Sequence, residues 1–310
     1  SIISDDLEFL REETGLEATP LEWLWRVAEG GIVGDRAMAD FPIDHSVPAV
    51  KETIGGIDEA RMRLQKFLNY KLNKYSIDRN NPDTPAVSGL SPWLHFGHIS
   101  SFEIIEKVFA KENWSVDSLN HEDTGKGTRS GWWGTSESAS SFLDQIITWR
   151  ELGFNFAYNR IDHATIETIP NWAKISMTEH INDNRTLYSL EELEQAETHD
   201  EIWNASQREL LRTGQMHNYM RMLWGKKILE WSPDPETAAE RMIYINDKWA
   251  LDGRDPNSYT GIFWVLGRHD RAWGPERPIF GKVRYMSSES AMRKLKLKNY
   301  LERKCHGFWY

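Results

Sequence analysis

Residues 245–257 are the richest source of possible chemistry in this chain. They read Ile-Asn-Asp-Lys-Trp-Ala-Leu-Asp-Gly-Arg-Asp-Pro-Asn and place carboxylates, amides and a guanidinium around a Gly/Pro turn. Carboxylates and amides bind hydroxyl and N–H groups, whereas a guanidinium binds anions. The segment is therefore suited to holding a large polar cofactor.

A second segment, residues 215–224, lies shortly before the first and reads Gln-Met-His-Asn-Tyr-Met-Arg-Met-Leu-Trp. Its Arg221 stays charged at every physiological pH, and Asp252 is a candidate partner for it. Trp224 and Trp231 are seven residues apart, which on one helix is about two turns or roughly 10 Å along one face. That spacing suits stepwise electron transfer, and it suits core packing equally well.

A third candidate is formed by residues 75–82, Tyr-Ser-Ile-Asp-Arg-Asn-Asn-Pro, and residues 88–97, Ser-Gly-Leu-Ser-Pro-Trp-Leu-His-Phe-Gly. Ser91 followed by Pro92 predicts a helix start, with Ser91 as N-cap and Pro92 as first helical residue. The free N–H groups of a helix start can bind an anion such as pyrophosphate. Because capped helices without a ligand are far more common, this pattern alone leaves both readings open.

The elements that must position these residues are predicted to be helices. Apolar residues recur at three- and four-residue spacing across 57–72, which predicts an amphipathic helix. Convincing strand patterns are missing, residues 113–141 read as a long surface loop, and residues 232–236 as the end of one helix and the start of another. Three capping boxes mark further helix starts: Ser100-x-x-Glu103, Ser189-x-x-Glu192 and Thr198-x-x-Glu201.

Composition narrows the class of protein. The net charge is −10, from 37 Lys+Arg and 47 Asp+Glu, which argues against a protein that coats nucleic acid indiscriminately. The stretch 268–304 nevertheless carries eleven Lys/Arg and four Asp/Glu, so it predicts either a basic face or a solvated helix surface. The lone Cys305 excludes an intramolecular disulfide, and neither a metal site, a membrane span nor a signal peptide is expected.

Taken together, these segments resemble the flavin-binding core of the DNA photolyase/cryptochrome superfamily, and most closely its class II cyclobutane pyrimidine dimer photolyases. The resemblance runs from about Asp44 to Arg303. Residues 88–97 match nearly letter for letter, with Trp93 in place of Tyr, and residues 269–274 and 280–286 resemble the C-terminal signature of the family. The implied fold is an all-helical FAD-binding domain over 48–310, preceded by a helical lead-in over 1–47.

The resemblance also implies roles for individual residues. It assigns FAD binding to Tyr75, Ser88, Gly89, Leu90, Ser91, Arg150, Asn218, Arg221, Asn246, Asp252 and Asp255. It assigns stepwise electron transfer to Trp203, Trp224 and Trp231, and places Asn246 at flavin N5. It assigns contacts with a flipped pyrimidine dimer and its phosphates to Arg79, Trp149, Met222, Trp264, Arg271 and Arg284.

The chain departs from the family pattern in two respects. Nothing in it resembles the N-terminal α/β antenna domain, so it is either a fragment or a protein that lacks this domain. The dimer-facing glutamate of the family falls on Gln145. An amide can donate a hydrogen bond but cannot supply a proton, so less efficient repair is expected unless Asp144 substitutes.

Three functions follow from the resemblance. The first is light-driven DNA repair, in which an electron from reduced FAD splits a cyclobutane pyrimidine dimer; the enzyme would be a monomer in the cytoplasm and nucleoid, or in a nucleus. The second is a cryptochrome-like photoreceptor with the same flavin, which Gln145 favours. The third is a flavin-binding relic. The retained substrate residues favour the repair enzyme.

Overall fold

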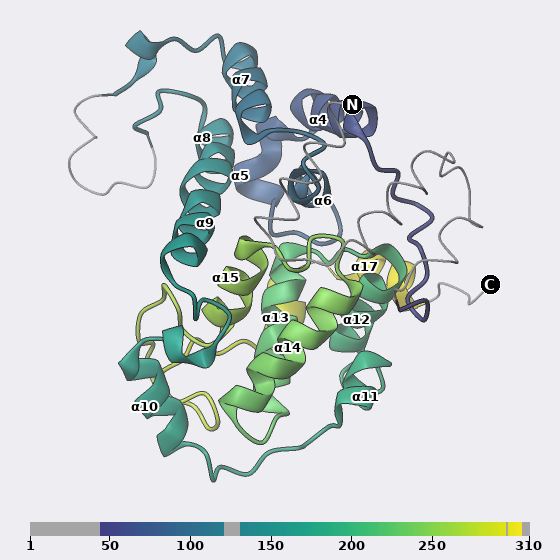
Figure 1. Ribbon diagram of the computed structural model, residues 1–310, viewed down its shortest axis with the longest axis vertical. Helices are drawn as coiled ribbons and strands as arrows, with labels where there is room; N and C mark the ends of the chain where they lie inside the picture. The colour runs from purple at the N-terminus through teal and green to yellow at the C-terminus, as the bar shows by residue number, and fades with distance from the viewer. Residues whose placement is uncertain (1–43, 121–130, 296, 306–310) are drawn as a thin grey trace, which may run out of the picture. The chain divides into compact units, whose positions relative to one another are not determined.

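The computed structural model describes residues 44–120, 131–295 and 297–305, and its regular elements in these ranges are helical, as expected (Figure 1). The α-helices are α4 (Ile57–Tyr70), α5 (Tyr75–Asp78), α6 (Ser91–His95), α7 (Ser101–Lys111), α8 (Glu137–Leu143), α9 (Arg150–Asn159), α10 (Asn171–Glu179), α11 (Leu190–Glu194), α12 (Glu201–Thr213), α13 (Asn218–Glu230), α14 (Pro235–Trp249), α15 (Pro256–Val265), α16 (Ser288–Lys294) and α17 (Lys298–Cys305). Shorter turns are η1 (Leu72–Lys74), η2 (Val116–Ser118), η4 (Ile166–Thr168) and the π-helical turn η3 (Asp144–Trp149). In these ranges every helix is too short or too polar to cross a bilayer.

The described residues between Val50 and Cys305 belong to one compact unit. The expected lead-in, residues 1–47, lies outside the described residues up to position 43. The expected boundary at position 48 therefore stays a prediction.

The amphipathic helix predicted over 57–72 is confirmed as α4, which ends at Tyr70, so Leu72 falls in η1. Ala60, Leu64, Phe67 and Leu68 lie on its buried face. They contribute to a first hydrophobic core that also takes side chains from α5, α6, α7, α8 and η3. The three- and four-residue spacing of apolar side chains therefore decided which face of this helix is buried.

Several helix starts agree with the capping patterns. The hydroxyl of Ser100 accepts from the N–H of Glu103, and Ser189 forms a full capping box with Glu192. Asp234 caps α14 in the predicted stop-and-start segment, accepting from the N–H of Thr237 at 2.7 Å. In each of these starts, a short polar side chain directly before the helix satisfies a backbone donor that has no intrahelical partner.

Two predicted caps are wrong. Asp200, not Thr198, caps α12 and accepts from two backbone N–H groups, while the Thr198 hydroxyl donates to Asn204. Ser91 is the first residue of α6, and Leu90 occupies the cap position without a side-chain bond. A carboxylate nearer the helix displaces the threonine, and the Ser91 hydroxyl is used elsewhere, as described below.

The expected loop 113–141 is shorter than predicted, because α8 already begins at Glu137. The prediction treated the serines of this stretch as surface residues, but Ser138 and Ser140 are buried in α8. The hydroxyl of Ser138 lies 3.0 Å from that of Ser76 and donates to the carbonyl of Asn73 at 3.2 Å. Hydroxyls with internal partners can be buried at little cost, which polarity alone does not reveal.

A second hydrophobic core surrounds α13, which packs against α12, α14 and α15. This helix is buried on nearly all sides, from Met220 to Leu229. Gly225 permits the close approach, because a Cβ there would lie 2.7 Å from a methyl group of Val265 and 3.1 Å from the sulfur of Met242. Residues on α13 are therefore held in place from three directions.

Lys226 is a charged residue type inside this core, with no exposed surface. Its Nζ donates to the carbonyl of Val265, the last residue of α15. Burial lowers the pKa of Lys226 from 10.5 to about 7, because the charged form is cut off from water. Between these two pH values the unfolded chain binds more protons at this position than the folded chain does.

We therefore expect stability to rise with pH between about 7 and 10.5 through Lys226, by at most ~1.4 kcal/mol per pH unit. Lys226→Met should lack this contribution. Urea unfolding of both proteins at pH 7 and pH 9 would check it. The readout is the change in the free energy of unfolding between the two pH values, compared between wild type and Lys226→Met. An equal change in the free energy of unfolding for the two proteins would contradict the prediction.

Candidate functional site

The predicted pair of Arg221 on α13 and Asp252 in the turn after α14 is present. Arg221 Nη2 lies 3.0 Å from Asp252 Oδ1, and the side chains are 27% and 14% exposed. Burial alone would raise the pKa of Asp252, but the Arg221 guanidinium and the Ser91 hydroxyl together hold that pKa below its usual value. The site therefore contains a lasting ion pair with part of the guanidinium still open to a ligand.

Residues 88–97 meet the 252–255 turn at two places. The Ser91 hydroxyl binds Asp252, and His95 Nδ1 lies 3.4 Å from Asp255 Oδ2. Asp255 also caps α15, accepting from the N–H of Asn257 at 2.8 Å. Two segments that are about 160 residues apart in the chain are thus joined beside Arg221.

Gly89 leaves room for a ligand to approach the backbone in this segment. Its φ is +66°, and a Cβ added there would meet nothing within 4 Å. Leu90, in contrast, is 1% exposed, so its side chain belongs to the core and only its backbone can take part in binding. A partly exposed backbone without a side chain can approach a phosphate group closely.

Asn246, on α14, is buried and its amide can adopt only one orientation. Its Nδ2 lies 2.5 Å from Ser258 Oγ and 3.2 Å from Asp247 Oδ1. A carboxylate can only accept, and Asp247 also accepts from the Arg254 N–H and the Tyr259 hydroxyl. The nitrogen of the Asn246 amide must therefore face Asp247, which leaves its carbonyl oxygen as the free acceptor.

Tyr75 and Arg79 lie together, with the Arg79 guanidinium 5.7 Å from the centre of the Tyr75 ring. The Tyr75 hydroxyl bonds Arg79, and the backbone of Arg79 contacts His217, which caps α13. Arg79 was expected among the substrate residues. The structure places it beside Tyr75 and the start of α13, and its role in substrate binding stays a prediction.

In the described parts of the chain, three other residues of the expected cofactor set form neither a hydrogen bond nor an ion pair with Arg221. Arg150 pairs with Glu151 at 2.5 Å and covers the ring of Phe154. Asn218 is exposed at the first position of α13, and Ser88 Oγ lies 3.5 Å from the N–H of Leu90. Their assignments remain predictions of the resemblance.

The tryptophans Trp203, Trp224 and Trp231 form one buried series, with at most 3% exposure. Trp203 lies between the others: its ring is 5.4 Å from that of Trp231, and its Nε1 donates to the carbonyl of Trp224 at 3.0 Å. Trp224 and Trp231 both belong to α13, although Trp231 is its C-cap: the last helical residue is Glu230, and the N–H of Trp231 still donates to the carbonyl of Lys227 at 3.0 Å.

Tyr188 continues this series from Trp231, with the ring centres 5.3 Å apart. It is partly exposed, whereas the three tryptophans are buried. A single tyrosine in a polar segment carries no recognisable sequence signal, so the sequence did not reveal its position next to Trp231.

Trp149 and Trp264 come together from η3 and α15. Their ring centres are 4.9 Å apart with an angle of 66° between the planes, so they form a corner of two apolar faces rather than two walls of a slot. Trp149 Nε1 donates to Asp144 at 2.8 Å, which fixes the ring within the π-helical turn that also carries Gln145. Such turns are rare and often occur at functional sites.

Arg271 and Arg284 are exposed and lie on the same aromatic ring. Their guanidinium carbons are 4.7 Å and 5.0 Å from the centre of Trp273. Trp273 was not among the predicted site residues, although its place in the 269–274 motif was a usable signal. Met222 is partly buried against the second core, and the structure does not join it to these arginines in the parts it describes.

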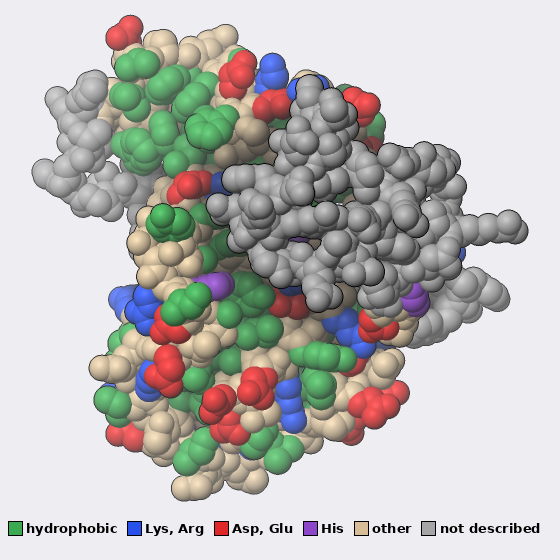
Figure 2. Space-filling model, viewed as in Figure 1, with side chains coloured by type: hydrophobic (Ala, Val, Ile, Leu, Met, Phe, Trp, Pro, Cys, Tyr) green, Lys and Arg blue, Asp and Glu red, His purple; other side chains and the backbone are tan. Residues whose placement is uncertain are grey.

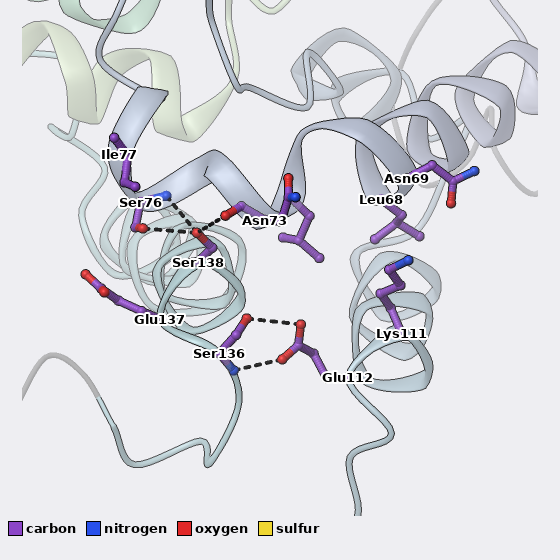
Figure 3. A pocket seen from close by; sticks show the side chains of 11 residues that line it. Leu68, Asn69, Asn73, Ser76, Ile77, Lys111, Glu112, Ser136, Glu137 and Ser138 are labelled. Carbon is purple, nitrogen blue, oxygen red and sulfur yellow. Dashed lines mark hydrogen bonds between the residues drawn. The ribbon is translucent and has the colours of Figure 1, made fainter.

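A hollow of about 540 Å³ lies between α4, η1 and α5 on one side and α7 and α8 on the other (Figure 3). Its polar groups bind one another, since Ser136 donates to Glu112 at 2.7 Å and 3.0 Å, and Ser138 bonds Ser76. The predicted site residues are not among those that line it. Size alone therefore does not make it the candidate site.

Comparison with known proteins gives consistent results. The chain is 40% identical over 250 residues to a deoxyribodipyrimidine photo-lyase of Methanothermobacter thermautotrophicus, covering 80% of this chain and 50% of that one. It is 36% identical over 293 residues to the enzyme of the same name from Potorous tridactylus, covering 94% and 49%. The chain thus spans about half the length of the curated relatives it matches, and no protein-family model matches it.

Solved structures share the fold. A class III photolyase from Agrobacterium tumefaciens aligns with a TM-score of 0.59 and 19% identity, covering 87% of this chain and 50% of that one. A cryptochrome from Synechocystis aligns with a TM-score of 0.57 and 17% identity, covering 83% and 46%. With motifs, fold and relatives in agreement, the chain belongs to the DNA photolyase/cryptochrome superfamily.

Proposed function

We propose that this chain is the FAD-binding domain of a class II-type photolyase, which uses light to split cyclobutane pyrimidine dimers in DNA. The main support is the joining of Ser91, Arg221 and Asp252, residues from three distant segments, into one hydrogen-bonded ion-pair cluster. The 36–40% identity to proteins named deoxyribodipyrimidine photo-lyase supports the same proposal.

The residues of the site fit a flavin dinucleotide. Arg221 is a counter-charge for a flavin ring that is anionic when reduced, and Asp252 holds the guanidinium in place. The free carbonyl oxygen of Asn246 would accept from the N5–H of the reduced ring, and the open backbone at Gly89 would approach the pyrophosphate. When bound, FAD would supply the electron that splits the dimer, while the protein supplies orientation and electrostatics.

The substrate side of the site offers an apolar corner bordered by cations. The faces of Trp149 and Trp264 would pack against a dimer that has been turned out of the duplex, since unpaired bases stack well on indoles. Arg271 and Arg284 would hold the flanking phosphates. The Asp144 carboxylate accepts from the Trp149 indole through Oδ2, so it orients that ring.

Gln145 is the one observation that favours the alternative, a cryptochrome-like photoreceptor without efficient repair. The two functions can be separated with the purified protein. A flavin absorption spectrum together with blue-light conversion of a dimer-containing oligonucleotide to the undamaged one would support the repair enzyme. A flavin spectrum without conversion would support the photoreceptor, and a protein that cannot be loaded with flavin would contradict both.

We expect Gln145→Glu to raise the repair yield per absorbed photon severalfold. A protonated glutamate can hydrogen bond the dimer carbonyl and also supply a proton, which an amide cannot. Repair per photon should be compared in wild type, Gln145→Glu and Gln145→Leu at equal flavin content. Equal yields in wild type and Gln145→Glu would remove this position from the explanation of the activity.

A further inference from the structure

A smaller hollow of about 270 Å³ lies beside the proposed DNA contacts. The residues that matter for the argument are Tyr219, Trp273, Arg277, Arg284, Tyr285 and Lys294, and together they define what we call the basic pocket. Its lining comes from the start of α13, from residues 273–277 and 283–290, and from the end of α16.

The charge of the basic pocket is positive and is not neutralised. It has no carboxylate in its lining, and in the described ranges Arg277, Arg284 and Lys294 have no ion-pair partner. The neighbouring Lys282 differs, because it pairs with Glu276 at 3.2 Å and does not line the pocket. Figure 2 shows acidic and basic side chains interspersed on one face of the molecule. Three converging, unpaired cations attract an anion.

The two guanidiniums are held by aromatic rings rather than by carboxylates. Arg277 lies 5.8 Å from the centre of the Tyr285 ring, and Arg284 lies 5.0 Å from that of Trp273. Stacking restrains the side chain but leaves the N–H groups available to bind both oxygens of a phosphate. The guanidiniums of the pocket are therefore oriented and available to bind a phosphate group.

The position of the pocket indicates where this phosphate comes from. Trp273 and Arg284 border the basic pocket, and Trp273 also carries Arg271, which is proposed to hold phosphates next to the dimer. The volume is below the roughly 300–1,000 Å³ of sites that enclose a whole small-molecule ligand. One backbone phosphate with its sugar fits this description better than a free nucleotide cofactor.

We propose that Arg277 and Lys294 of the basic pocket bind a backbone phosphodiester of the damaged DNA beyond the phosphates that Arg271 and Arg284 would hold, and so set the register of the duplex on the protein. This inference rests on the proposed function. The contact is independent of base sequence, since phosphates carry no sequence information. It adds Arg277 and Lys294 to the residues that contact DNA.

The test is the salt dependence of DNA binding by the flavin-loaded protein. The double variant Arg277→Gln, Lys294→Gln should bind a dimer-containing duplex about tenfold more weakly near 0.1 M salt, with a slope of log K against log salt reduced by about 1. Undamaged duplex should show the same loss, because the contact does not read the lesion. Lys282, a nearby lysine that is also exposed but paired with Glu276, is the control, and Lys282→Gln should change neither quantity by a comparable amount.

The outcomes separate this inference from the function on which it rests. If wild type binds the damaged duplex and the double variant keeps its slope, only the inference about the basic pocket fails. If wild type neither binds the duplex nor repairs it, the proposed function fails. Inorganic phosphate or a mononucleotide that binds the pocket at micromolar concentration, with no effect of the variant on DNA, would mean that the site serves free phosphates and would also overturn the inference.

Discussion

Arg221→Met is expected to yield a protein that retains little or no flavin. The substitution removes the cation proposed to face the reduced ring and leaves Asp252, whose side chain is 14% exposed, without its partner. Removing one member of a buried pair costs about 3 kcal/mol, because the remaining charge stays desolvated. We expect a loss of that order in stability, and a flavin affinity lower by about 100-fold or more.

A second substitution can separate the loss of stability from the loss of flavin affinity. Asp252→Asn in the Arg221→Met background removes the orphaned carboxylate and should restore most of the stability, but not the flavin affinity. Arg208→Met is a suitable control, since Arg208 forms a more exposed pair with Glu201 at 3.6 Å. Flavin absorbance after purification and isothermal titration with FAD are the measurements. An Arg221→Met protein with normal flavin content would refute the placement of the cofactor.

Trp203→Phe is expected to slow light-driven reduction of the bound flavin by at least about tenfold, which needs a barrier only ~1.4 kcal/mol higher. Trp203 contacts both of the other tryptophans, through its ring to Trp231 and its Nε1 to Trp224. A phenylalanine fills most of the same space but is much harder to oxidise than an indole. The series would therefore be interrupted at its middle member while the core stays packed.

The measurement is photoreduction under blue light with an external electron donor, followed at the flavin absorption bands. Repair by protein that has first been reduced chemically should stay unchanged, because that reaction does not need the tryptophans. Trp172→Phe is the matched control, since Trp172 packs against the same core but outside the series. Loss of both photoreduction and repair in Trp203→Phe would show that the residue acts through structure alone.

Local patterns were sufficient where neighbouring residues decide the outcome. The apolar spacing of α4 and the capping residues Ser100, Ser189 and Asp234 act within one or two helical turns, so the sequence predicted them correctly. The predictions failed where a distant group competes for the same atom. The Ser91 hydroxyl is used by Asp252, and buried Ser138 is satisfied by Ser76, so neither serine behaves as its neighbours suggest.

The site residues also divide into features that the local sequence indicated and features that depend on contacts between distant residues. The residue types at 88–97, 215–224 and 245–257 were enough to indicate the family and the pair of Arg221 and Asp252. They could not indicate that Arg79 lies beside Tyr75, that the two indoles of the corner touch, or that Trp273 carries two arginines. Each of those contacts joins residues whose orientation depends on how several helices pack.

By itself, the sequence determined the helical class, the starts of α4, α7, α11 and α14, and the set of polar groups available to a cofactor, because helix periodicity, capping and motif chemistry act over short stretches of chain. Tertiary structure alone decided the orientation of the Asn246 amide, through the accept-only carboxylate of Asp247, and the course of the tryptophan series through Trp203. The physical reason is that hydrogen-bond direction and ring contact depend on atoms brought together from separate helices, whose relative placement is fixed only when the cores pack.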